Sequence, residues 1–383
     1  MSVVKKNQVL KIDGRTGEGG GQIIRTALAL SMLTGTPIEI SNIRAGRSKP
    51  GLMRQHLMCV QASQEISNAK VSGAHLGSTA FSFAPNEINA GDYTFDIGSA
   101  GSTSLVLQTV LPALLFANSA AATLDNTMAS TVTIKGGTHN PLAPTTEFLQ
   151  LAFIPAIAKL GMEVAIELGQ TGFAPLGGGE INATIQPFVR RAGTTPFNLS
   201  ERGDLVGIKL VASNLNLDHD ICKRELSSAT ACLLEAGIDD ALITSKCAKL
   251  TGIGEGNTCY AVVEHQVKGT GNASPNTNVS HNANEIHREV FSLLGEKRTS
   301  AENMGNHLGG MIKRYLLDSD ALVDEYLTDQ LLLPLALAGG GEFTARTISA
   351  HTETQAWLIQ QFLPVDIQIS PINANKSLIK IIS

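Results

Sequence analysis

One order of secondary structure recurs three times along this sequence: helix, strand, turn, helix, strand. The hydrophobic periodicity predicts the six helices of these units at residues 22–33 and 52–68, 102–117 and 147–160, and 324–338 and 355–363. Similarity between the units is weak, but the order matches. Each unit can therefore place one sheet and two helices in a shared core, and equivalent turns then fall at equivalent ends of the units.

A stretch of different character separates the second unit from the third. Residues 201–318 contain their own pattern of strands and helices, which is enough for an inserted α/β domain. We therefore expect a repeat domain formed by residues 1–200 and 319–383 and an inserted domain formed by residues 201–318. Within the insert, the polar run that begins at Lys268 has almost no large apolar residue and is expected to form an exposed, mobile loop.

The first unit contains a glycine-rich turn, with four glycines in the five positions 17–21, followed by an apolar helix. Glycines allow positive φ, and several backbone N–H groups can then point toward one anion at the helix N-terminus. Glu18 offers oxygen ligands for a hard cation, and Arg25 lies about two helical turns further on. The alternative is a structural connection with a solvated Glu18 and a surface Arg25. Neither the GxxxxGK[ST] nor the GxGxxG phosphate-binding pattern is present.

A basic turn follows in the same unit. Every charged residue between positions 40 and 64 is positive: Arg44, Arg47, Lys49 and Arg54, with His56 close behind. The planar guanidinium pairs with phosphate oxygens through two parallel hydrogen bonds, so this turn suits a phosphorylated chain end. A solvated basic surface is the competing interpretation.

Polar side chains in the second and third units are further candidates. His351 lies in the expected turn SAHTET, where a neutral imidazole could attack phosphorus, although a surface or capping role is equally simple. Tyr326, Asp329 and Gln330 precede an apolar helical run, and Tyr326 could stack on a base. Gln108 interrupts an apolar helix, where its amide needs a partner. His281, His287 and His307 show no metal-ligand spacing and are expected at the surface, and His139 is expected in a turn.

Charge and cysteine content narrow the functional classes. The net charge of −5 argues against a broad basic footprint on duplex nucleic acid, although a local basic site is compatible with it. Five cysteines form no CxxC pair, zinc spacing or disulfide framework. No uncharged apolar run of eighteen residues and no leader-like N-terminus is found, so we expect a cytoplasmic protein without membrane contact.

Together these segments resemble the RNA 3′-terminal phosphate cyclase family, in its catalytic class I branch. The resemblance spans nearly the whole chain and rests on GEGGGQIIR, IRAGRSKPGLMRQH, IGSAGSTSLVLQTVLPALLFA, KGGTHNPLAP, GEKRTSAE, EYLTDQLLLPLALAGGGEFT and HTETQ. It implies an α+β fold of three repeats, each with two helices and a four-stranded sheet, like the C-terminal domain of translation initiation factor 3. It also implies that the inserted α/β domain is thioredoxin-like.

The resemblance also implies a reaction and its residues. A histidine, here His351, takes AMP from ATP, AMP passes to an RNA 3′-phosphate, and the 2′-hydroxyl then closes a 2′,3′-cyclic phosphate. The implied cofactors are ATP and Mg²⁺ or Mn²⁺, with Glu18 as the metal ligand. The implied contacts with ATP or AMP are Arg25, Gln108, Pro144, Tyr326, Asp329 and Gln330. The implied contacts with the phosphates and the RNA end are Arg44, Arg47, Gln55 and His56.

Two departures and two alternatives accompany this resemblance. Thr171 replaces a basic residue that is usual in the family, and Ala174 replaces an aromatic one, so local loop packing is expected to differ. One alternative is a non-catalytic, cyclase-like ribosome-biogenesis factor, which lacks the nucleophile; the presence of His351 and of the glycine turn argues against it. The other is an enolpyruvyl transferase, but those enzymes use six repeats and no histidine nucleophile.

Overall fold

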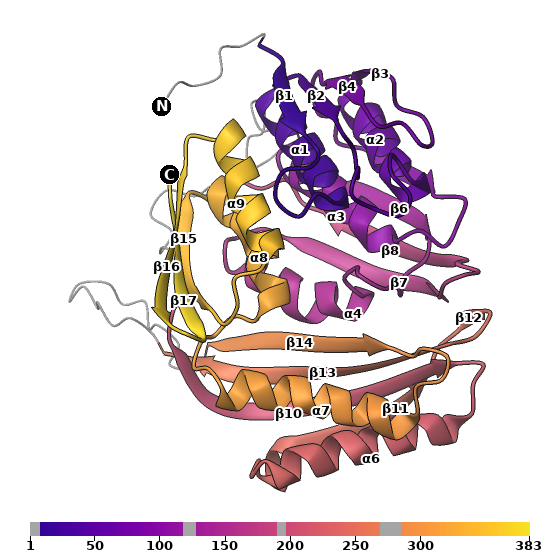
Figure 1. The fold of residues 1–383 in the computed structure, drawn as a ribbon, viewed down its shortest axis with the longest axis vertical. Helices are drawn as coiled ribbons and strands as arrows, with labels where there is room; N and C mark the ends of the chain where they lie inside the picture. Colours follow the sequence, from indigo (N-terminus) through magenta and orange to yellow (C-terminus); the bar gives the residue numbers. More distant parts are fainter. Residues whose placement is uncertain (1–7, 118–127, 190–196, 269–284) are drawn as a thin grey trace.

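A computed structural model describes residues 8–117, 128–189, 197–268 and 285–383, and the strands among these residues form four sheets (Figure 1). The first sheet has the order β1-β2-β4-β3, with β1 parallel to β2 and the other pairs antiparallel. Its elements are β1 (Leu10–Asp13), α1 (Gly21–Thr34), β2 (Ile38–Ser41), α2 (Arg54–Ser67), β3 (Lys70–Ser72) and β4 (Phe81–Ala84). Gly35 ends α1 in the left-handed conformation, as its position after the last apolar residue predicts.

The second sheet has the order β12-β7-β8-β6-β5. Its elements are β5 (Asp92–Asp96), α3 (Thr103–Leu115), β6 (Ser130–Gly136), α4 (Thr146–Phe148), η1 (Leu149–Phe153), α5 (Ile154–Ala158), β7 (Val164–Gly172), β8 (Gly179–Ile185) and β12 (Gly252–Ile253). The helices α4, η1 and α5 follow one another without a break, and η1 is a π-helical turn just before Pro155. A proline cannot donate to the α-helical ladder, and a widened turn accommodates that loss.

The third sheet joins residues from the two sides of the expected insert. Its order is β16-β17-β15-β9, and β9 pairs with β15 in parallel. Its elements are β9 (Phe197–Leu199), α8 (Glu325–Ala338), β15 (Gly340–Ala345), α9 (Ala350–Phe362), β16 (Asp366–Asn373) and β17 (Lys376–Ile382). The chain therefore leaves this sheet after β9 and returns to it at β15.

The fourth sheet lies between β9 and β15 in the sequence and has the order β11-β10-β13-β14. Its elements are β10 (Arg202–Leu215), α6 (His219–Glu235), η2 (Asp240–Leu242), β11 (Ile243–Lys249), β13 (Gly256–Val267), β14 (Ile286–Leu294) and α7 (Ala301–Leu317). Helices α6 and α7 cover the face turned away from the other sheets, and β14 runs beside the rest of the molecule (Figure 1). A hydrophobic cluster of its own lies under these two helices.

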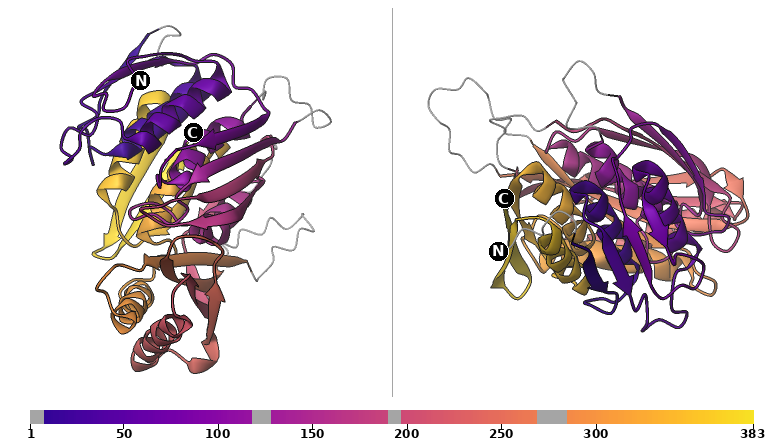
Figure 2. Two further views of the ribbon diagram at one scale, coloured as in Figure 1. Left: turned by 90° about the vertical axis from the view of Figure 1, so that its right-hand side faces the viewer. Right: turned by 90° about the horizontal axis from the view of Figure 1, so that it is seen from above.

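The helices of the other three sheets pack on one another and share a single core. Helix α1 contacts α2, α3 and α9, and α8 contacts α9, so helices from distant parts of the chain lie side by side (Figure 2). Ile24, Leu107, Leu331 and Leu358, from four of these helices, are all fully buried. Burial of apolar surface stabilises a fold by about 25 cal/mol per Å². This packing is the main contribution that holds the N-termini of these helices in fixed relative positions.

All six expected helices are present, but the sequence pattern does not predict several of the strands. Strands β5, β8, β14 and β17 were not predicted, because strand pairing depends on distant partners more than on local propensity. Helix α9 begins at Ala350, whereas the sequence pattern predicts a turn up to Thr354. The cause is Ser349, whose hydroxyl accepts a hydrogen bond from the N–H of Thr352 and so caps a polar first turn.

The structure corrects the expected position of one histidine. His139 lies in the segment after β6, as expected, where it is buried, contacts Glu147 at 3.2 Å and stacks on Phe173. His287 is buried in β14 rather than exposed, while His307 is exposed on α7 as expected. His281 and most of the loop that begins at Lys268 lie outside the described residues. Among the described residues, no helix is both long enough and apolar enough to cross a lipid bilayer.

Candidate active site

The glycine turn brings charged side chains close to the start of α1. Gly17 and Gly19 have φ of 61° and 67°, in the left-handed region, and Gly20 is the residue that precedes α1. A side chain at Gly20 would collide with the Glu18 carboxylate, and one at Gly21 would collide with His56 and Arg25. Glycines fit here because polar side chains from three segments approach the backbone closely.

A short chain of hydrogen bonds runs from His351 across three helices, with Gln22 at its centre. In the first turn of α9, its Nδ1 donates to Oε1 of Gln22 at 2.9 Å, and Nε2 of Gln22 donates to Oδ2 of Asp329 on α8 at 3.1 Å. A second contact between α1 and α9 joins Thr26 to Gln355 at 2.7 Å. Because Nδ1 carries the proton of this hydrogen bond, Nε2 of His351 keeps its lone pair.

The charges around His351 keep the imidazole neutral. Partial burial lowers the pKa of His351, and the positive charges of Arg25 and Arg47 lower it further. Burial raises the pKa of Asp329 to about 7, although the charge of Arg25 opposes this change. A neutral imidazole with a free nitrogen, next to two guanidinium groups, can attack an electrophile that carries negative charge.

The residues expected to bind phosphates lie around the same turn. Glu18 forms an ion pair with Arg47. Arg44 has φ of 51° and donates to the carbonyl oxygens of Lys49 at 2.7 Å and Gly51 at 3.0 Å, which fixes its loop. Burial and then the charges of Arg25 and Arg44 lower the pKa of His56 to about 3, so this imidazole is neutral. The structure thus gathers Arg47, His56 and Arg25 beside the glycine turn.

Three of the remaining candidates make contacts of their own. Gln55 Oε1 accepts a hydrogen bond from the N–H of Ser102 at 3.0 Å, and so connects α2 to the start of α3. The Pro144 carbonyl accepts from Ser104 at 2.7 Å. Gln108 on α3 donates to Gln330 on α8, which confirms that its amide has a polar partner.

Tyr326, Arg44 and Pro144 are not joined directly to His351. Within the described residues, these three make no hydrogen bond or ion pair with His351, Gln22 or Asp329. Tyr326 is 55% exposed on the first turn of α8, so its ring is free to contact a ligand.

Gln22 belongs to this site, although the sequence pattern does not single it out. It is only 7% exposed and contacts both His351 and Asp329. The sequence does contain a signal for Gln22, because an amide inside an apolar helix needs hydrogen-bond partners, as the amide of Gln108 does. The partners themselves lie more than 300 positions away in the sequence and leave no local trace.

The side chains present suit a metal ion that arrives with phosphates rather than a resident one. In the described ranges, no group of three or more His, Cys, Asp or Glu side chains could hold a metal. Glu18 is a single carboxylate beside guanidinium groups. Mg²⁺ commonly binds through one or two carboxylates together with substrate phosphates, so Glu18 fits such an ion.

We predict that Gly17→Ala lowers the free energy of unfolding by about 1–3 kcal/mol. A side chain at position 17 would be forced into the left-handed region and would overlap the hydroxyl of Thr354 on α9. Denaturant unfolding of both proteins measures the difference. Gly46→Ala is the matched control, because a side chain there meets no atom within 4 Å; equal loss in both variants would contradict this account of the turn.

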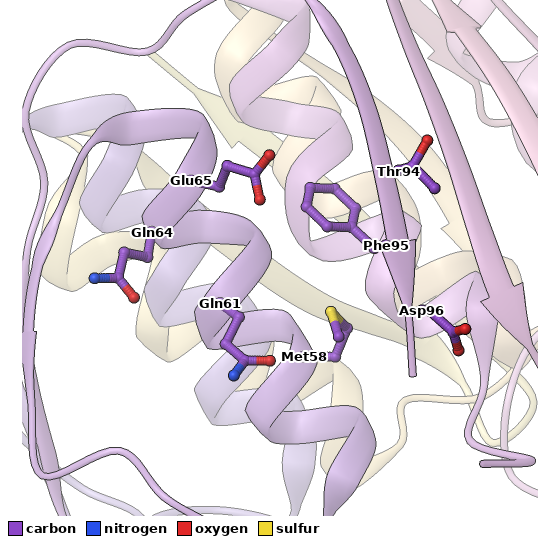
Figure 3. Close-up of a pocket in the computed structure, with 7 residues that line it drawn as sticks. All are labelled: Met58, Gln61, Gln64, Glu65, Thr94, Phe95 and Asp96. Atoms are coloured by element: carbon purple, nitrogen blue, oxygen red, sulfur yellow. The ribbon is translucent and has the colours of Figure 1, made fainter. Parts of the chain in front are cut away.

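A separate groove lies between α2 and β5 and shares no residue with the site above. Figure 3 shows Glu65 and Phe95 pointing toward each other across it, with Met58, Gln61, Gln64, Thr94 and Asp96 as its other labelled lining residues. The groove contains two carboxylates, no basic group and none of the predicted site residues. It is therefore unsuited to an anionic substrate.

Comparisons with known proteins place the chain among one set of relatives. A family model described as RNA 3′-terminal phosphate cyclase matches residues 16–369. Proteins named RNA 3′-terminal phosphate cyclase from Ralstonia nicotianae, Koribacter versatilis and Pseudomonas fluorescens are 45%, 40% and 41% identical to it. These alignments cover 94%, 94% and 96% of this chain and 93%, 92% and 96% of the respective relatives.

Proposed function

The chain belongs to the RNA 3′-terminal phosphate cyclase family, and on that premise we propose that it converts RNA 3′-terminal phosphates to 2′,3′-cyclic phosphates at the expense of ATP. The observation that supports this most is His351, whose Nδ1 is held by Gln22, whose Nε2 is free, and whose pKa is lowered by burial and by the charges of Arg25 and Arg47. We extend the proposal to a cytoplasmic location, which agrees with five free cysteines.

The reaction we propose has three displacements at phosphorus. Nε2 of His351 attacks the α-phosphorus of ATP, a P–N bond forms, and diphosphate leaves. An oxygen of the RNA 3′-phosphate then attacks the adenylate, and His351 leaves as a neutral imidazole. Finally the 2′-hydroxyl attacks the 3′-phosphorus, loses its proton, and AMP leaves. The last step is intramolecular and is favoured by its high effective concentration.

The surrounding residues divide the binding between two ends of the site. Arg25 and Arg47 would stabilise the negative charge that develops at phosphorus. Arg44, Gln55 and His56 would meet the phosphates and the RNA end. The adenylate would lie among Gln108, Pro144, Tyr326, Asp329 and Gln330, where Tyr326 offers a ring face.

We also propose the domain division that the sequence pattern predicts. Residues 1–200 and 319–383 would form three repeats, each like the C-terminal domain of initiation factor 3, and residues 201–318 a thioredoxin-like insert. Support comes from the order of the sheets and from the separate hydrophobic cluster under α6 and α7.

Glu18 would hold the divalent cation, which supplies charge neutralisation for the phosphates of ATP. In the free protein its partner is Arg47. A nucleotide with its bound cation can replace both partners of this ion pair: the cation binds the Glu18 carboxylate, and the phosphates bind the Arg47 guanidinium. Each of the two charges then keeps a partner of opposite sign.

We predict that Glu18→Ala raises the metal concentration needed for half-maximal adenylylation by about tenfold, with a smaller effect at saturating metal. The measurement is a titration of MgCl₂ at constant ATP with the rate of adduct formation as readout. Glu39→Ala, which removes an exposed carboxylate from β2, is the control. An unchanged metal requirement in the Glu18 variant would refute its role as ligand.

Conversion of a labelled RNA tests the overall function. An RNA with a 5′ label and a 3′-phosphate, incubated with the protein, ATP and MgCl₂, should become resistant to phosphatase as the cyclic phosphate forms. The same RNA with a 2′-deoxy terminal nucleotide should stop at the adenylylated end, because it lacks the attacking hydroxyl. If neither RNA changes while the protein is folded, a non-catalytic role becomes the better proposal.

A further inference from the structure

A buried cluster of ionisable side chains connects β14 to the segments that begin α8 and α9. On the face of β14 covered by α7, His287 Nε2 lies 2.8 Å from Glu289 Oε1, and both side chains are 2% exposed. Across the strand pair, His287 lies opposite His265, whose ring packs against Tyr315 of α7. The guanidinium carbon of Arg202 lies over the Tyr315 ring, 4.9 Å from its centre. None of these groups has a part in the proposed chemistry.

Burial is the largest influence on the pKa values of Glu289 and His287. It raises the pKa of Glu289 well above the ordinary value, and the charge of Asp324 raises it further. Burial lowers the pKa of His287 well below the ordinary value, with the charge of Lys159 as the next cause. Both shifts favour the uncharged forms of the two groups, and the 2.8 Å contact gives each of them a polar partner in an apolar place.

The second contact of Glu289 is with the residue that precedes α8. The backbone N–H of Asp324 lies near the Glu289 carboxyl and opposes the rise of its pKa, and the Asp324 carboxylate accepts from Nε of Arg346 at 2.5 Å. Asp324 is 3% exposed, so the ion pair has little solvent around it. The backbone supports the same arrangement, because the N–H of Arg346 donates to the carbonyl of Val323 at 2.9 Å.

These contacts bear directly on the position of the candidate active site. Asp324 precedes the helix that carries Tyr326, Asp329 and Gln330, and Arg346 precedes the cap of the helix that carries His351. The Asp324–Arg346 pair thus joins the starts of α8 and α9, and Glu289 joins that pair to β14. Lys159 forms a further ion pair, at 2.7 Å, with Glu285, the residue that precedes β14.

We propose that Glu289, held by His287, is a positioning residue through which the β14 sheet fixes α8 and α9 at the spacing that adenylyl transfer to His351 requires. The inference rests on the proposed function for its chemical readout. It assigns to the fourth sheet a role in the first reaction step, although no residue of that sheet contacts His351 in the described part of the chain.

Three variants separate positioning from general stability. Glu289→Ala removes both contacts and should lower the rate of adduct formation at saturating ATP by about tenfold or more, since small displacements of reacting groups are costly. Glu289→Gln keeps a donor for His287 and an acceptor for Asp324, and should restore the rate to within about threefold of wild type. Glu264→Ala removes a carboxylate from the neighbouring strand that faces the other side of the sheet, and should leave the rate unchanged.

The rates are measured well below the unfolding temperature of each variant. If Glu289→Ala does not fold, Arg346→Gln breaks the Asp324–Arg346 ion pair, to which Glu289 is joined, from a side chain that is 22% exposed, and a similar loss is expected. Wild-type rates in a folded Glu289→Ala protein, or in Arg346→Gln where that variant stands in, would overturn the proposal. Failure of Glu289→Gln to restore the rate would overturn it as well.

Hydrogen exchange gives a readout that does not depend on activity. Peptides covering residues 321–330 and 346–352 should exchange faster in Glu289→Ala than in wild type or Glu289→Gln, because the starts of both helices lose their anchor. If wild type forms no adduct but these peptides respond, the proposed function fails and the structural connection stands. Equal exchange in all three proteins would overturn the connection itself.

Discussion

His351→Asn is expected to abolish formation of the covalent adenylate without unfolding the protein. Asparagine can still reach Gln22 with its amide, but it has no nitrogen lone pair able to attack phosphorus. His351 is exposed in the first turn of α9, and the cap of this helix depends on Ser349 and Thr352 instead. The loss should therefore be chemical, with a far smaller effect on stability.

The measurement uses ATP labelled at the α-phosphate, a divalent metal and no RNA. Wild-type protein should keep label through denaturation and release it in acid, as a phosphoramidate does, and His351→Asn should keep none. His307→Asn, at an exposed position of α7, is the matched control and should be labelled like wild type. Labelling of His351→Asn at the wild-type level would assign the nucleophile elsewhere.

The parts of the fold that depend on local pattern could be predicted from the sequence. The six helices follow from apolar periodicity, and Gly35 marks the end of α1 because a left-handed residue is needed there. Strand β8 could not be found in this way, since its alternating side chains follow a run of glycines and gain meaning only beside β6 and β7. Pairing information is spread over distant segments.

The candidate site shows the same division. Arg47 and Arg25 stood out because residue type alone suggests phosphate binding. The sequence does not reveal which residues these two arginines contact, and the ion pair of Arg47 with Glu18 was unexpected. His287 was expected at the surface, because it shows no metal-ligand spacing and the sequence pattern predicts no strand around it. Its burial depends on α7, which packs over β14 from later in the chain.

Gln22 is the residue whose replacement should affect the reaction most after His351 itself. Gln22→Leu keeps the volume but removes the acceptor of the His351 Nδ1–H and the donor to Asp329. The ring can then rotate or change tautomer, and we expect the rate of adduct formation to fall by about a hundredfold at every pH. Gln61→Leu, the same change at an exposed position of α2, should have no effect.

Gln22→Glu distinguishes orientation from charge. The reaction needs neutral His351, so the rate falls as the pH drops through the pKa of that imidazole, which burial and then two guanidinium groups hold below the ordinary 6.5. A carboxylate at position 22 still accepts from Nδ1 but stabilises the protonated ring, and so raises this pKa. The fall should then begin at a higher pH than in wild type, while the rate at high pH stays well above that of Gln22→Leu. A pH profile of Gln22→Glu identical to wild type would show that Gln22 does not contact the nucleophile in the reacting enzyme.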